Sequence, residues 1–156
     1  MLLDGTVLVA GSNPNDTPVD YDKVDPNNQY TAFPTEYRIE IWTPPYLIGK
    51  DHMRPTHITL SRRTFVPGVV FNVKFRPVKD PRSVDIVLYH GGFVTHALHM
   101  GQKMVFLPNQ GWEEIGGGFK RVIASIPRLA LAPGPYVLYA VVDGVPSIGQ
   151  SVLIET

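Results

Sequence analysis

The chain has 156 residues, of which 44% are hydrophobic, and this is typical of one globular domain with some additional sequence. Lys and Arg together number 14, as do Asp and Glu, so the formal net charge is zero. A neutral chain has no bulk field to attract nucleic acid or an anionic membrane, and we expect neither as a partner. It contains no cysteine, which excludes disulfides, thiolate metal ligands and cysteine nucleophiles.

The N-terminal part predicts two strands separated by a long loop. Residues 6–10 are mostly apolar or β-branched, and the turn signal Asp4-Gly5 precedes them. A strand that opens on a turn predicts a partner strand further upstream. Residues 11–35 are rich in Asn, Asp and Pro and exceed the usual connection of about 4–6 residues. We interpret them as a functional loop or as a segment left loose by missing neighbours.

The alternating residues 37–42 predict a strand, and the Thr-Pro-Pro-Tyr sequence after it predicts a stiff connector. We therefore expect the main domain boundary near residues 45–51. Beyond it, short apolar segments recur with turn signals between them, as in an immunoglobulin-like sandwich. The 15 Pro and 14 Gly residues also favour short strands over helices. The predicted strands are residues 56–60, 69–75, 83–89, 104–107, 120–125, 134–142 and 151–155.

Residues 89–100 hold three of the five histidines, His90, His96 and His99. The Gly-Gly pair after His90 allows the chain to bend, and imidazole is a ligand that suits copper and zinc. On an extended strand, however, His96 and His99 would point in opposite directions. One or two histidines also fall short of the three or four protein ligands that metal sites usually need. From these residues alone, polar loop histidines remain the simpler interpretation.

Other polar groups give weaker signals. Glu113 and Glu114 are adjacent and would face opposite sides of a strand, which argues against a glycosidase pair. Residues 116–118 are three glycines without the Lys-Ser/Thr of a phosphate loop, and they predict a turn. Ser147 follows a turn and lacks a hydrolase context. Residues 13–22 offer oxygen donors but not the spacing of a calcium loop.

Four segments together resemble the C-terminal part of the glyoxal oxidase and galactose oxidase group of copper radical oxidases, with glyoxal oxidase the nearer match. They extend over essentially the whole chain, in the order and with the spacing typical of that group. The segments are residues 3–15 (LDGTVLVAGSNPN), 37–47 (ending WTPPYL), 94–99 (VTHALH) and 133–147.

The resemblance implies an all-β chain in which residues 1–47 are a remnant of the last β-propeller blade with a long loop. Residues 48–156 would form an immunoglobulin-like (early-set) β-sandwich. It also implies copper held by two tyrosines and two histidines, with one tyrosine cross-linked to a cysteine and storing a radical. Small aldehydes or primary alcohols would be oxidised by O2, giving H2O2. His96, in Val-Thr-His-Ala, matches the histidine that a loop of the C-terminal domain contributes.

The departures from the family pattern predict an incomplete site. The family's Tyr-His ligand pair lies upstream of the strand matched by Leu3-Asp4-Gly5, and the Tyr-Cys radical lies further upstream. We therefore expect a C-terminal oxidase fragment that is inactive alone, with exposed apolar patches near Trp42 and Phe93. The resemblance implies an extracellular protein, although the N-terminus lacks the pattern of a signal peptide. The alternative is a stand-alone, non-catalytic binding module whose contacts would include Tyr30, Phe33 and Trp112.

Overall fold

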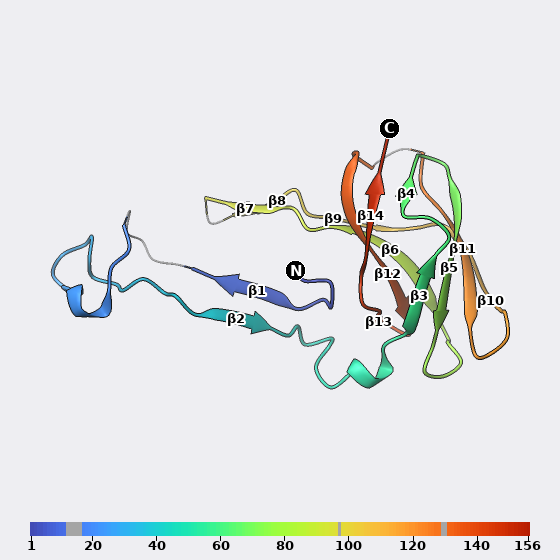
Figure 1. The fold of residues 1–156 in the computed structure, drawn as a ribbon, viewed down its shortest axis with the longest axis horizontal. Helices are drawn as coiled ribbons and strands as arrows, with labels where there is room; N and C mark the ends of the chain where they lie inside the picture. The colour runs from blue at the N-terminus through green and yellow to red at the C-terminus, as the bar shows by residue number, and fades with distance from the viewer. Residues whose placement is uncertain (12–16, 97, 129–130) are drawn as a thin grey trace.

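A computed structural model describes residues 1–11, 17–96, 98–128 and 131–156. The predicted loop at 11–35 lies partly outside these residues, as do three of its possible calcium donors, Asn13, Asn15 and Asp16. In the described part the fold is all-β, with two short 3-10 helices, η1 (Tyr21–Lys23) and η2 (Asp51–Met53). Figure 1 shows a sandwich at one end, from which two thin ribbons, β1–β2 and β7–β8, project toward the same side.

The sandwich consists of two sheets of mainly antiparallel strands. The first has the order β10-β11-β5-β3 and the second the order β4-β14-β12-β6-β9, with β13 paired to β12. The strands of the first sheet are β3 (Thr56–Leu60), β5 (Val70–Arg76), β10 (Asn109–Glu114) and β11 (Lys120–Ser125). Those of the second are β4 (Thr64–Phe65), β6 (Val84–His90), β9 (Lys103–Phe106), β12 (Gly134–Val142), β13 (Val145–Pro146) and β14 (Gln150–Ile154).

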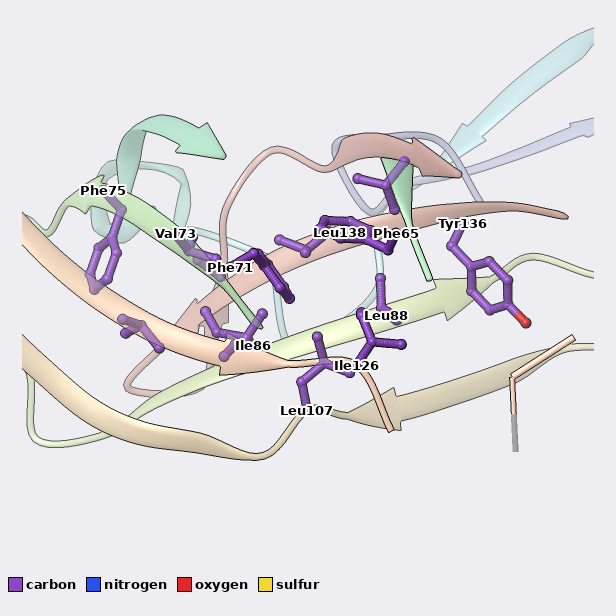
Figure 2. Packing of buried hydrophobic residues seen from close by; sticks show 14 of the residues in the cluster. Phe65, Phe71, Val73, Phe75, Ile86, Leu88, Leu107, Ile126, Tyr136 and Leu138 are labelled. Carbon is purple, nitrogen blue, oxygen red and sulfur yellow. The ribbon is translucent and has the colours of Figure 1, made fainter. Parts of the chain in front are cut away.

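The core lies between the two sheets, where alternate residues of the facing strands meet. Along β5 the odd-numbered residues from Phe71 to Phe75 are buried and the intervening side chains are not. Figure 2 shows these side chains packed against Ile86 and Leu88 of β6 and Leu138 of β12. Burial of such a two-sided apolar layer is the main stabilising contribution in a sandwich.

All seven strands predicted for the sandwich form, with ends that shift by one residue at most. The Asp143-Gly144 turn also forms, and it joins β12 to β13 through the pair Val142↔Val145. Sequence patterning missed β4 and β13, which have two residues each, and β10, whose Asn-Gln-Gly-Trp-Glu-Glu sequence lacks apolar alternation. For the histidines after the Gly-Gly pair the sequence was consistent with a loop or a short irregular strand, and the structure has two short strands there, β7 and β8.

The first ribbon pairs β1 (Val7–Ala10) with β2 (Ile39–Trp42) in antiparallel register. The partner of β1 in the structure is therefore a downstream strand, whereas the sequence predicted an upstream one. Both faces of the ribbon carry exposed apolar side chains: Leu8 and Ile41 form a cross-strand pair on one face, and exposed Trp42 pairs with the partly buried Val7 on the other. The Trp42 side chain is 60% exposed, as expected from the sequence. Strands that are apolar on both faces are typical of sheets packed on both sides.

Arg54 connects the N-terminal turn to the sandwich. Its Nη2 donates to the carbonyl of Asp4 (2.8 Å), its Nη1 to the carbonyl of Pro146 (3.1 Å) and its Nε to Asp51 Oδ1 (2.8 Å). The turn itself is held by Asp4, which accepts hydrogen bonds from the hydroxyl and amide of Thr6. These two bonds lower the pKa of the Asp4 carboxyl, so the charged form is favoured in the folded turn.

Candidate functional site

His96 lies at the tip of the second ribbon, which we call the His96 arm and define as residues 91–101. Strands β7 (Phe93–Thr95) and β8 (Leu98–Met100) form its two sides and pair antiparallel. The His96 side chain is exposed, and its φ of +52° lies in the left-handed region. Apolar side chains along the arm are exposed as well, including Phe93 (58%) and Val94 (74%). The arm thus carries an exposed imidazole at its tip and exposed apolar side chains along its length.

Two other histidines hold the base of the arm. His99 Nε2 lies 2.5 Å from the carbonyl oxygen of Gly91, so it donates a hydrogen bond across the ribbon. His90 Nδ1 lies 3.1 Å from the Gly101 carbonyl oxygen and 3.2 Å from the Gly92 amide, and its proton decides which contact is the hydrogen bond. The His90 ring also meets the Tyr136 ring edge-on at 5.3 Å. These two histidines therefore stabilise the arm, whereas the His96 side chain is exposed to solvent.

At Gly92 the backbone of the opposite side of the arm lies very close. Its φ is +65°, and a Cβ at this position would lie 2.1 Å from the carbonyl oxygen of Met100. Any side chain would therefore force the strands apart, in addition to the cost of a left-handed backbone. The neighbouring Gly91 has room, because a Cβ added there would have a ring carbon of Tyr89, at 3.6 Å, as its nearest neighbour.

Replacing Gly92 by alanine is expected to open the arm locally while the sandwich stays folded. Amide hydrogen exchange should accelerate within residues 93–100 and remain slow in β5, β6 and β12. Gly91→Ala is the matched control and should leave exchange in the arm within about threefold of the wild type, which corresponds to less than ~1 kcal/mol. Equal effects of the two substitutions would contradict the steric role of Gly92.

The His96 ring is oriented by its neighbour Thr95. Adjacent residues of an extended strand point to opposite sides, but the left-handed backbone at His96 brings the ring back beside Thr95. Thr95 Oγ1 and His96 Nδ1 are 2.9 Å apart, within hydrogen-bond distance. With Nδ1 engaged, Nε2 is the ring nitrogen on the side away from Thr95.

This geometry fits one ligand of a copper site. An exposed imidazole whose other nitrogen is hydrogen-bonded is the usual form of a metal-binding histidine. The remaining ligands are not gathered nearby, since no group of three His, Cys, Asp or Glu side chains suited to a metal occurs among the described residues. His99 turns toward the base of the arm and does not join His96. Within residues 1–11, 17–96, 98–128 and 131–156, these residue types thus form no complete metal site, and His96 stays a candidate for one ligand.

A second feature is an apolar hollow of about 200 Å³ on the outer face of the six-stranded sheet. Met104, Phe106 and Tyr139 form its floor, and Tyr46 and Met1 lie at its side. Burial, reinforced by the nearby Tyr46 phenol, raises the pKa of Tyr139 to about 12. Burial likewise raises the pKa of Tyr89. The residues around the hollow are mostly apolar, so it is suited to apolar groups.

The other polar groups have structural roles. Glu113 pairs with Arg121 and Glu114 with Lys120 on opposite faces of β10, as predicted for adjacent strand residues. The three glycines at 116–118 form the turn between β10 and β11, all with positive φ. Ser147 is fully buried, and its hydroxyl accepts a hydrogen bond from the Ala140 amide, so it is not placed as a nucleophile.

The all-β sandwich of two sheets is consistent with an early-set domain of the galactose oxidase type. The chain belongs to that family: the profile described as "Galactose oxidase-like, Early set domain" matches residues 54–154. The match includes both sheets of the sandwich and the His96 arm.

Curated relatives extend the similarity over nearly the whole chain. The chain is 33% identical to "Aldehyde oxidase GLOX1" of Arabidopsis thaliana over 162 residues, which is 98% of this chain and 25% of that protein. It is 34% identical to "Aldehyde oxidase GLOX" of Vitis pseudoreticulata, over 96% of this chain and 28% of that protein. A "WSC domain-containing protein" of Arthroderma benhamiae is 25% identical over 99% of this chain and 14% of its own length. The chain therefore spans about a quarter of the two aldehyde oxidases.

A comparison with solved structures carries little functional information. A solved structure of the Pseudomonas fluorescens DNA glycosylase AlkC bound to DNA aligns with 66% of this chain and 30% of its own, at 16% identity. Its TM-score of 0.39 is too low to support an argument about this chain. Within the described residues, no helix has the length and hydropathy needed to cross a bilayer.

Sequence reasoning singled out His96 but missed the residues that orient it. The Gly-Gly pair at the start of the arm was a signal for the bend, yet nothing in the sequence pointed to the contact between Thr95 and His96. That contact depends on a left-handed backbone at a non-glycine residue, which patterning does not predict.

Proposed function

We propose that this chain is the C-terminal part of a copper radical oxidase and that His96 is the copper ligand it contributes. The observation that carries the proposal is the position of His96, exposed at the tip of an arm in a galactose oxidase-like early-set domain. The aldehyde oxidase relatives supply the reaction class. We further propose an extracellular location, which rests on family resemblance alone.

The proposed reaction oxidises small aldehydes or primary alcohols with O2. For an aldehyde, water is added and two electrons and two protons pass to O2, giving a carboxylic acid and H2O2; a primary alcohol gives an aldehyde and H2O2. Bound copper, together with a protein radical, supplies the two-electron chemistry. Within this chain, His96 would hold the metal through Nε2, and His90, His99 and Gly92 would keep the arm in position.

Exposed apolar surface supports the division into a propeller remnant and a sandwich. We assign residues 1–47 to the last blade of a propeller and residues 48–156 to the sandwich. The β1–β2 ribbon is apolar on both faces, and the side chains of the His96 arm are apolar yet exposed. Both features fit segments that contact further sheets in a longer protein, since large exposed apolar patches usually mark interaction sites.

The isolated chain is expected to be inactive, because one imidazole without a radical partner cannot complete the chemistry. The alternative of a stand-alone binding module would rest on Tyr30, Phe33 and Trp112. These exposed aromatics come from two distant segments, the loop before β2 and strand β10. A binding module would use a cluster of aromatic side chains on one surface. The separation of these three residues along the chain does not favour such a cluster.

A chimera tests the proposal. We would replace the matching quarter of the Arabidopsis aldehyde oxidase by this chain, load copper and measure H2O2 formed from a small aldehyde such as methylglyoxal. Peroxide should form in the chimera and not with the isolated chain. His96→Gln should reduce copper content and abolish turnover, whereas His99→Gln should keep the metal ligand and lose only part of the activity.

Two outcomes would contradict this proposal. Undiminished copper binding and turnover in the His96→Gln chimera would remove the assigned ligand. Peroxide formation by the isolated chain would show that it contains a complete site of its own and would refute its assignment as a dependent part.

A further inference from the structure

The His96 ring has two nitrogens, and only a nitrogen without a proton can bind a metal. A neutral imidazole carries its proton on either Nδ1 or Nε2, and the nitrogen without it holds the free lone pair. In the arm, Nδ1 lies 2.9 Å from Thr95 Oγ1, and Nε2 is the nitrogen on the side of the exposed His96 ring away from that hydroxyl. A hydroxyl can accept from a protonated Nδ1 or donate to an unprotonated one, so the direction of this bond determines which nitrogen is available.

We propose that Thr95 is a positioning residue that accepts a hydrogen bond from Nδ1–H of His96 and so keeps the Nε2 lone pair free. The inference rests on the proposed function, since with Nδ1 engaged the His96 ring must bind a metal through Nε2. The partner of the second nitrogen in metal-binding histidines fixes both the tautomer and the ring orientation. Here that partner is the preceding residue in the chain.

The backbone makes this assignment possible. With ordinary extended geometry at residue 96, the two side chains would project from opposite faces of the strand. The φ of +52° at His96 brings them to the same side, in a left-handed conformation that is unfavourable for a residue with a side chain. The hydrogen bond from His99 to Gly91 joins the two sides of the arm near its base. In this conformation the Thr95 contact sets the orientation of the His96 ring.

Two substitutions separate the hydroxyl from the shape of the side chain. Thr95→Val keeps the branched shape and removes the oxygen, whereas Thr95→Ser keeps the hydroxyl and removes a methyl group. Metal-free protein labelled with ¹⁵N would be studied in alkaline buffer, in which imidazoles are neutral. The ring-nitrogen chemical shifts of His96 then report directly which nitrogen carries the proton.

The wild type and Thr95→Ser should have a protonated Nδ1 and an unprotonated Nε2, and Thr95→Val should shift the proton toward Nε2. Copper(II) affinity, followed by paramagnetic broadening of the His96 ring signals, should fall about tenfold in Thr95→Val and recover in Thr95→Ser. Unchanged amide spectra of the sandwich strands would establish that each variant is folded.

Protonated Nε2 in the wild type, or an unchanged tautomer in Thr95→Val, would overturn the inference. The proposed function fails by a different measurement, namely equal copper binding by the wild type and His96→Gln. A wild type with the predicted tautomer but no copper bound at His96 would therefore refute the ligand role and leave the Thr95 hydrogen bond intact.

Discussion

Replacing Phe75 by alanine is expected to lower the free energy of unfolding by about 3–5 kcal/mol, which is the usual cost of removing a buried phenyl ring. Phe75 is fully buried on β5 and packs in the layer between the sheets. The free energy of unfolding of such domains is only about 5–15 kcal/mol, so the substitution would remove a large part of it. Thermal denaturation should show a midpoint lower by roughly 10 °C.

The same truncation at an exposed ring provides the control. Phe106 on β9 is 62% exposed on the outer face of the second sheet, and Phe106→Ala should cost less than about 1 kcal/mol. Similar losses for the two variants would mean that the layer between the sheets is not the main source of stability.

Arg54→Ala is expected to lower the free energy of unfolding by about 2–4 kcal/mol, because two backbone carbonyls lose charged hydrogen bonds. The Arg54 side chain is only 10% exposed, and it joins the N-terminal turn to the segment after β12. Arg54→Lys should recover little, since an ammonium cannot match the three directions of the guanidinium bonds. Urea denaturation measures the loss, and hydrogen exchange at residues 2–6 reports release of the turn.

Arg63 is the matched control for Arg54. It also donates to a carbonyl, that of Ser151, and to Gln150, but it is exposed. Arg63→Ala should cost less than about 1 kcal/mol, because water replaces the lost bonds. A loss at Arg63 as large as that at Arg54 would contradict the importance of burial at this junction.

The sandwich was predictable because its strands repeat a simple pattern. In β5 and β12 apolar residues alternate or run together between turn signals, and burial of one face selects the register. Strand β10 lacks that pattern and forms at the edge of its sheet by pairing with β11. Its existence depends on a neighbour distant in sequence, which local reasoning does not supply.

The candidate site was predictable in part. His96 was assigned through resemblance to a family, because a single loop histidine carries no signal of its own. Its orientation by Thr95 and the close approach at Gly92 depend on left-handed backbone angles and on atoms of the opposite strand. Arg54 looked like an ordinary charged residue, and its role emerges only when the N-terminal turn folds onto the sandwich.

The β1–β2 ribbon and the sandwich are expected to differ greatly in their free energies of unfolding. Two short paired strands contribute too little to hold themselves together in water, whereas the sandwich is a cooperative unit. The ribbon should therefore unfold many times for each unfolding of the core, exposing unpaired apolar strands at each opening. Such edges are templates for intermolecular pairing. The lifetime of this chain as a soluble monomer would then fall as its concentration rises, even under conditions in which its core never unfolds.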